Sequence, residues 1–346
     1  MSAIPEPIYP FSQAPEPGAW SELLPGLRWL RMPLPFALDH VNLWLIQEGA
    51  GWALVDTGYA LPRIKSLWEA ILARLEGPLT RIIATHFHPD HLGLAHWLQE
   101  RTGASLVCTA GEYLTAHASW QEMAGHGTGP MLAQFCAHGL GPAAVNALAE
   151  RGNAYRHGVD GLPETYERIR DGDHLTMGAC SWQVICGYGH SPEHASLYCA
   201  EQGVLISGDM LLPRISTNIS VFAVNPMADA LGQYLSSLRR LEALVPDSVL
   251  VLPSHGLPFK GLQARVAALE AHHEARLRLL EESCEVPRSA EELLPTLFPR
   301  ALDTHQTMFA MGEAIAHLNH LEKAGRLRRS VDADGKILYL RAVPAN

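Results

Sequence analysis

The chain has 346 residues, of which 47% are hydrophobic and 18% charged, so it can build a packed core, and its length suggests two domains or one large domain with a small appendage. Its formal net charge of −10 disfavours a dedicated nucleic-acid-binding protein, because such proteins normally present a basic surface. The sequence has no basic start followed by an apolar run, no apolar stretch of membrane-spanning length and no CxxC pair, so we expect a cytoplasmic protein with reduced cysteines.

The first part of the chain has an extended start and then a β-rich pattern. Residues 1–20 carry five prolines, which predicts an extended arm. Three apolar runs between residues 26 and 58, separated by short turns, predict successive strands. Residues 62–76 begin with Pro62 and place their apolar side chains on one face, which predicts an amphipathic helix. A short strand, RIIAT, comes next.

Four potential metal ligands follow this strand directly, in the segment THFHPDH at residues 85–91. They are His86, His88, Asp90 and His91. Clustered imidazoles and a carboxylate are costly to hold together unless a cation binds them. Neutral imidazole and carboxylate oxygen together suit zinc, with iron and manganese as alternatives. The sequence therefore predicts a site for a divalent metal, with zinc preferred.

The middle of the chain changes character. After a helix over 92–102 and the strand SLVCT, residues 112–166 are helical in composition, which predicts an inserted lid or substrate-binding wall. Four β runs return between 174 and 209, followed by a helix at 228–244 and the strand SVLVLPSHG. A long amphipathic helix is expected over 261–285, with His272 and His273 solvated or at an interface.

The last segment, 287–346, is predicted to be a small independent module. A short helix after Ser289, a second helix near 304–311 and a third over 312–325 precede a hairpin with Asp-Gly at its turn. Eight Lys or Arg and seven Asp or Glu between 288 and 346 make the module nearly neutral, which is unusual for a nucleic-acid-binding unit. The small basic patch of Arg326, Arg328 and Arg329 is interpreted as a helix cap or an interface.

The segment THFHPDH resembles the signature of the metallo-β-lactamase superfamily, and its other motifs follow in order: DTG at 56–58, GHSPEH from His190, LISGDM around Asp209 and LPSHG around His255. The segments DHVNLWLI and GDMLLPRIS, with the final module, resemble the glyoxalase-II-like branch with a C-terminal lactamase-associated winged helix. The resemblance implies an α+β fold. Residues 21–286 would form a four-layer αββα sandwich with the 112–166 insertion, and residues 287–346 a winged-helix-like domain.

The resemblance also implies a binuclear hydrolase with a defined ligand set. Seven side chains would hold two ions: His86, His88 and His190 the first, Asp90, His91 and His255 the second, and Asp209 both. Asp90 and Asp209 would thereby take part in catalysis, and Asp56 would orient a ligand histidine. A hydroxide bridging the ions, with its pKa lowered to about neutral, would attack an ester-type bond.

Two substrate classes stay open at this stage. Thioesters or lactones of a hydrophobic acyl group suit the glyoxalase-II-like core and the apolar insertion, whereas single-stranded RNA suits a branch that also includes endoribonucleases. A DNA-binding regulator is a third interpretation, disfavoured by the charge balance. Tyr59, Arg214 and Ser216 lie beside ligand motifs and are candidates for substrate binding. We therefore expect a small-molecule acyl substrate, nucleic acid as the less favoured partner and no membrane association, and a homodimer is compatible with the sequence.

Overall fold

The computed structural model describes residues 6–342, so residues 1–5 of the predicted arm and residues 343–346 of the predicted module lie outside the described part. The chain forms two compact units, each assembled from three segments. Within the described residues, unit 1 comprises 6–120, 154–217 and 237–266, and unit 2 comprises 121–153, 218–236 and 267–342. Segments far apart in the sequence therefore share one core in each unit.

The first sheet of unit 1 has seven strands that neighbour one another in chain order. Strands β1 to β4 pair antiparallel, whereas β4 to β7 pair parallel, so the carboxyl ends of β4 and β5 lie at the same edge. The strands are β1 (Trp20–Leu24), β2 (Leu27–Pro33), β3 (His40–Glu48), β4 (Gly51–Val55), β5 (Leu79–Ile83), β6 (Ser105–Cys108) and β7 (Glu167–Arg168).

The second sheet of unit 1 has five strands in the order β12-β11-β10-β9-β8. They are β8 (His174–Met177), β9 (Cys180–Gly187), β10 (His194–Cys199), β11 (Val204–Gly208) and β12 (Leu250–Pro253). Trp29 and Trp44 of the first sheet are buried in one hydrophobic cluster with Trp182 and Val184 of the second. The two sheets thus pack face to face over a shared apolar core.

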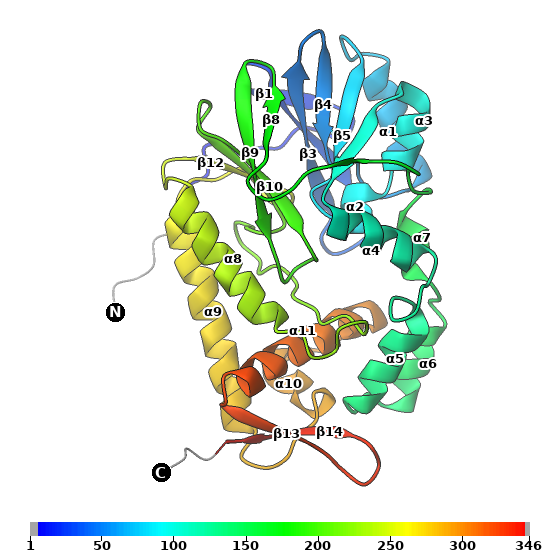
Figure 1. Cartoon of the computed structure of the whole chain (residues 1–346), viewed down its shortest axis with the longest axis vertical. Helices are drawn as coiled ribbons and strands as arrows, with labels where there is room; N and C mark the ends of the chain where they lie inside the picture. Colours follow the sequence, from blue (N-terminus) through cyan, green and yellow to red (C-terminus); the bar gives the residue numbers. More distant parts are fainter. Residues whose placement is uncertain (1–5, 343–346) are drawn as a thin grey trace. The chain divides into compact units, whose positions relative to one another are not determined.

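Helices cover the outer faces of both sheets (Figure 1). On the first sheet, α1 (Pro62–Leu72) buries Ile64, Trp68 and Ile71 in a cluster that also contains α3 (Ala95–Thr102). On the second sheet, Arg240 in the last part of α8 (Ala230–Leu244) donates a hydrogen bond to the carbonyl of Cys186, 3.0 Å away. Helix, sheet, sheet and helix make the four-layer sandwich, as predicted.

Four helices confirm the predicted helical character of residues 112–166. They are α4 (Ala110–Trp120), α5 (Thr128–Ala137), α6 (Pro142–Ala149) and α7 (Ala154–Gly158). Helices α4 and α7 belong to unit 1, and α5 and α6 to unit 2. The chain therefore leaves unit 1 after α4 and returns to it at α7.

The final part of unit 2 contains α9 (Leu262–Ser283), which begins in unit 1, then η1 (Glu291–Leu293), α10 (Leu294–Leu297), α11 (Thr304–Lys323) and the predicted hairpin of β13 (Leu327–Val331) and β14 (Ile337–Arg341). The prediction of two helices meeting at Gly312 was wrong, because α11 continues through it. His273 was expected to be solvated or at an interface, and the solvated alternative is wrong, because its side chain is fully buried and lies 3.1 Å from His317 of α11.

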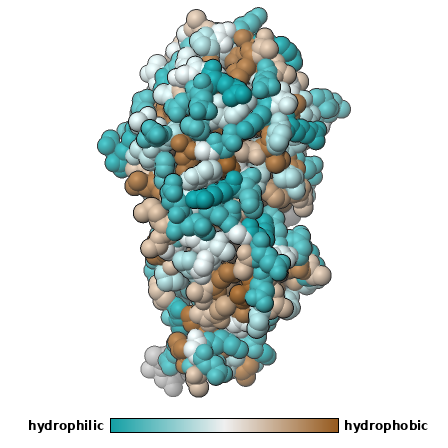
Figure 2. All heavy atoms as spheres, turned by 90° about the vertical axis from the view of Figure 1, so that its right-hand side faces the viewer, coloured by the Kyte–Doolittle hydropathy of each residue, from teal (hydrophilic) through white to brown (hydrophobic). Residues whose placement is uncertain are grey.

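The surface mixes polar and apolar side chains. In Figure 2, hydrophobic side chains form small groups separated by hydrophilic ones over the face shown. Among the described residues, no helix combines the length and the apolar character needed to cross a bilayer. All six cysteines are free thiols, four of them buried.

Candidate metal centre

The THFHPDH segment begins in the loop after β5 and ends in the short helix α2 (Pro89–Leu92). Asp56, which follows β4, binds both ends of this segment. The carboxylate of Asp56 accepts hydrogen bonds from the backbone N–H of Thr85 (2.8 Å) and from Nδ1 of His91 (2.8 Å). Asp56 has φ of 61°, a left-handed conformation that Asp tolerates better than most residues. Asp56 lies at the predicted DTG turn after β4, and its hydrogen bonds reach the segment after β5. It therefore links the carboxyl ends of two parallel strands.

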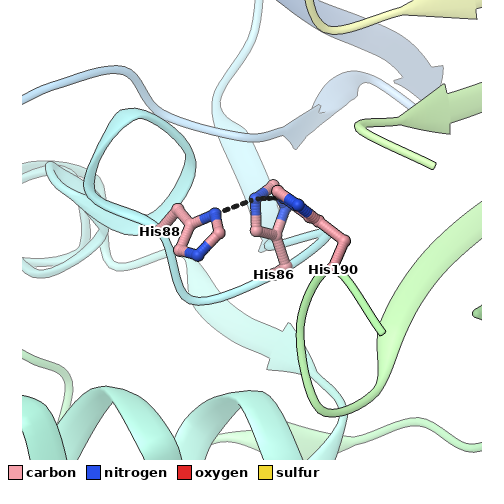
Figure 3. A group of neighbouring side chains, drawn as sticks. All are labelled: His86, His88 and His190. Atoms are coloured by element: carbon pink, nitrogen blue, oxygen red, sulfur yellow. Dashed lines mark hydrogen bonds between the residues drawn. The ribbon is translucent and has the colours of Figure 1, made fainter. Parts of the chain in front are cut away.

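Three predicted ligands, His86, His88 and His190, meet through their ring nitrogens (Figure 3). Nε2 of His86 lies 2.9 Å from Nδ1 of His88 and 3.2 Å from Nε2 of His190. His190 arrives on the loop after β9, in the second sheet. Nitrogen atoms that share one tetrahedral zinc ion at ordinary bond lengths lie about 3.3 Å apart. The spacing of the three rings therefore suits a common cation.

The other four predicted ligands meet beside this group. Nε2 of His255 lies 3.4 Å from carboxylate oxygens of both Asp90 and Asp209, and Nε2 of His91 lies 3.4 Å from Asp90 and 3.6 Å from Asp209. The second oxygen of Asp209 lies 3.5 Å from Nε2 of His190. Asp209 thus lies between the two groups of ligands, which is the position expected of a bridging carboxylate.

In His91 and His255, Nδ1 is hydrogen-bonded to a group outside the set of ligands, and Nε2 faces the cluster. Nδ1 of His91 donates to Asp56, and Nδ1 of His255 donates to the backbone carbonyl of His40, 2.7 Å away. Such a bond fixes both the ring orientation and the tautomer of a ligating histidine. Nε2 of each ring is then available as a ligand atom.

Two buried polar atoms of the cluster, Nε2 of His91 and Oδ1 of Asp209, have no hydrogen-bond partner in the described structure. A buried polar atom without a partner is unfavourable, and a bound cation would satisfy both. Nitrogen and carboxylate donors together are the set that zinc prefers. The residues present therefore fit a divalent metal.

The charges of the cluster point to the same conclusion. Burial and the neighbouring His190 lower the pKa of His88 to about 3, so its ring is a neutral donor near pH 7. Although burial opposes this, Asp209 raises the pKa of His255 to about 10. Burial likewise opposes the charged form of Asp209, but His255 and His91 hold the pKa of Asp209 well below its usual range. Buried carboxylates that need this much positive charge provide a favourable environment for a dication.

Two further residues support the cluster, although sequence reasoning did not select them. His194 is fully buried, and its Nε2 accepts the backbone N–H of Asp209 at 3.1 Å. Glu112 is buried on α4 and accepts the backbone N–H of Phe87 at 2.9 Å. His194 could have been selected from the sequence, because it lies only four residues after the predicted ligand His190. Nothing in the sequence connects Glu112 with residue 87.

The three predicted substrate-binding residues lie outside the group of ligands. Arg214 is exposed, with its guanidinium carbon 5.5 Å from the ring centre of Tyr9. Tyr59 is half-buried, and its ring makes an edge contact with Phe36 at 5.4 Å. Ser216 is half-buried on the loop after Asp209. Their roles in substrate binding stay predictions.

Comparisons with known proteins match most of the chain. Residues 37–255 match the family model described as Metallo-beta-lactamase superfamily, and residues 277–342 match Metallo-beta-lactamase-like, C-terminal domain. The solved structure of a Beta-lactamase domain protein from Burkholderia ambifaria is 47% identical, with a TM-score of 0.89, and the match covers 97% of this chain and 98% of that one.

Two curated relatives are more distant. Probable metallo-hydrolase YqjP of Bacillus subtilis is 26% identical, over 85% of this chain and 91% of that protein. Atrochrysone carboxyl ACP thioesterase of Aspergillus fumigatus is 22% identical, over 70% of this chain and 43% of that protein. The first therefore matches along most of its length, and the second over less than half.

Proposed function

This chain belongs to the metallo-beta-lactamase superfamily, and from that premise we propose that it is a binuclear zinc hydrolase of ester-type bonds. The substrate class that we propose is a thioester or lactone of a hydrophobic acyl group. The observation that carries the proposal is the convergence of seven nitrogen and carboxylate ligands, with buried atoms of His91 and Asp209 left without a hydrogen-bond partner.

The side chains divide the work as follows. His86, His88 and His190 would hold one ion, Asp90, His91 and His255 the other, and Asp209 would contact both. Two divalent ions, when bound, supply a water with a pKa near neutral as nucleophile and stabilise the negative charge that develops on the substrate oxygen. Asp56 and the carbonyl of His40 keep the rings of His91 and His255 oriented by accepting their outer N–H groups.

An acyl substrate is supported by the thioesterase among the relatives, although that protein is much longer than the matched region. The apolar insertion supports it less than its composition suggested. Phe135, Leu140 and Leu148 are buried, so their apolar side chains are not available to a substrate, whereas Met123 is exposed.

RNA is the less favoured substrate because the basic patch of unit 2 is partly neutralised. Arg326 pairs with Glu281 at 2.7 Å and with Glu274 at 3.4 Å. Arg341 lies 3.6 Å from the same Glu281. Arginines already paired with carboxylates contribute less to binding phosphates than free ones. Of the patch predicted at Arg326, Arg328 and Arg329, Arg326 is therefore less available to a nucleic acid.

The deciding experiment is parallel turnover of acyl thioesters, lactones and single-stranded RNA by purified protein of measured metal content. We expect hydrolysis of the thioester or lactone. We also expect the variants Asp209→Ala and His88→Ala to lose full metal stoichiometry and to lose activity by more than about 100-fold, because each removes a metal ligand.

The matched control is Asp160→Ala, which removes a partly exposed carboxylate that pairs with Lys65 at 2.5 Å. This variant should keep its metals and its activity. Undiminished turnover by a metal-depleted Asp209→Ala protein would refute the binuclear mechanism. RNA cleavage that survives nuclease controls and disappears in Asp209→Ala would assign the chain to the phosphodiesterases instead.

A further inference from the structure

The peptide groups of Phe87, the residue between His86 and His88, are held on both sides. Its N–H donates to Oε2 of Glu112 at 2.9 Å, and its carbonyl accepts a hydrogen bond from the Tyr155 hydroxyl at 2.7 Å. The Tyr155 ring also stacks on the Phe87 ring, with centres 5.8 Å apart and an interplanar angle of 28°. Backbone rotation at the centre of the His-x-His segment would break at least one of these contacts.

Glu112 connects this segment to a second ligand loop. Its other oxygen, Oε1, accepts hydrogen bonds from the hydroxyl of Ser191 at 2.7 Å and from the backbone N–H of Glu193 at 2.6 Å. Ser191 directly follows the predicted ligand His190. One buried carboxylate therefore ties the loop that carries His86 and His88 to the loop that carries His190.

The cost of burying Glu112 indicates that its position matters. A buried carboxylate is unfavourable unless its oxygens are hydrogen-bonded, and here three donors surround it. Burial raises the pKa of Glu112 to about 7 in spite of these donors. A residue held at this cost, with every bond directed at a ligand loop, suits a role at the centre better than a role in general packing.

Glu112 lies on α4 and Tyr155 lies on α7. Between these two helices, the chain forms part of unit 2. We propose that Glu112 and Tyr155 are positioning residues that set the spacing of His86, His88 and His190 for the metal. This inference rests on the proposed function. The physical reason is that a metal site tolerates displacements of only about 0.5 Å in its ligands, which flexible loops do not hold by themselves.

The test uses the full chain and zinc alone as the probe. Tyr155→Phe removes one hydroxyl and keeps the stacked ring, and Glu112→Gln keeps the shape but replaces an acceptor oxygen with a donor. Tyr113→Phe is the matched control, because the Tyr113 hydroxyl on α4 donates only to the carbonyls of Pro163 (3.1 Å) and Glu164 (2.7 Å). Zinc affinity is measured by chelator competition, ligand geometry by the cobalt(II) absorption spectrum, and folding by thermal unfolding of the metal-free proteins.

We expect zinc affinity to fall about 10-fold or more in Tyr155→Phe and Glu112→Gln, with a changed cobalt spectrum, and to stay within about twofold in Tyr113→Phe. Equal zinc affinity and an unchanged spectrum in Tyr155→Phe would overturn the proposal. The proposal would also be overturned if all three variants lost zinc affinity in proportion to their loss of thermal stability, because the effect would then be one on folding in general. If Glu112→Gln does not fold, Tyr155→Phe decides the matter alone. Failure of the unsubstituted chain to bind zinc, iron or manganese would reject the proposed function, and with it the positioning role of Glu112 and Tyr155.

Discussion

Asp56 shows how one residue can combine backbone and side-chain requirements. Its φ of 61° turns the chain sharply after β4, and its carboxylate then reaches both Thr85 and His91. Asn also tolerates the left-handed conformation, so Asp56→Asn should fold normally. What the substitution removes is the negative charge facing the His91 ring.

For Asp56→Asn we predict a loss of metal affinity of about 10-fold to 100-fold, with little change in the thermal stability of the metal-free protein. Isothermal titration with zinc measures this change. Asp160→Asn, which removes a charge from a partly exposed ion pair, is the control and should bind zinc as the unsubstituted protein does. Unchanged affinity in Asp56→Asn would mean that Asp56 supports only the backbone turn.

At the level of elements, the ligands appear where strands end. His86 follows β5, His190 follows β9, Asp209 follows β11 and His255 follows β12. At the end of β11 the fit is close, because a Cβ added at Gly208 would lie 2.3 Å from Nε2 of His194. A glycine is needed there so that the backbone of Asp209 can approach the His194 ring.

Helix α11 illustrates a glycine of a different kind. A break was expected at Gly312, but this residue lies inside a 20-residue helix that begins with an Asp303 capping box. A Cβ added at Gly312 would lie 2.4 Å from Oγ and 2.9 Å from Cβ of Ser220. Gly312 therefore serves close packing between α11 and the segment that contains Ser220, both within unit 2.

Alanine favours helices over glycine by up to about 1 kcal/mol, yet we predict that Gly312→Ala destabilises the protein by about 1–3 kcal/mol through this clash. Urea denaturation measures the effect. Gly129→Ala in α5 is the control, because an added Cβ there meets no atom within 4 Å, and it should be neutral or stabilising. Adding Ser220→Gly to Gly312→Ala should recover part of the loss. A stable Gly312→Ala single variant would show that the helix shifts freely.

For the whole molecule, a buried histidine pair in unit 2 links stability to pH. His273 on α9 and His317 on α11 lie 3.1 Å apart through Nδ1 and Nε2, and His317 Nδ1 donates to the carbonyl of Glu313. Burial lowers the pKa of His273 to about 2 and of His317 to about 3. Nearby charged or titratable groups are Arg276, Glu313, His272 and His320.

The sign of the pH effect follows from these pKa values. Below pH 6.5 the unfolded chain binds protons at both histidines, whereas the folded chain excludes them down to about pH 3. Each site therefore costs up to about 1.4 kcal/mol of stability per pH unit as the pH falls from 6.5. We predict that the metal-free protein loses stability steeply between pH 6.5 and 5.

His317→Gln should lower the slope of stability against pH in this range, even if it lowers stability at every pH. Urea denaturation of both proteins at pH 5, 6, 7 and 8 gives the comparison. Between pH 7 and 8 the two slopes should converge, because the histidines of the unfolded chain lose their remaining protons there and those of the folded chain are already neutral. Parallel slopes down to pH 5 would count against a neutral buried pair.

The sequence by itself determined a metal-binding cluster at residues 86–91, and the resemblance of its motifs to a known superfamily implied the fold class and the other ligands. Five of the seven predicted ligands lie at the end of a strand or in the loop that follows it, and Asp90 and His91 lie in the short helix α2. Each belongs to a short motif whose residue types indicate its chemistry. Information of this kind is local, so it can be read along the chain.

Only the tertiary structure decided which residues support the centre. Glu112 bonds to residues 25, 79 and 81 positions away, and Tyr155 to a residue 68 positions away. The role of Gly312 also depended on the tertiary structure. Its residue type suggested the end of a helix, whereas in the structure it allows close packing against Ser220. Hydrogen bonds and close packing act between neighbours in space, and no local pattern records which distant segments become neighbours.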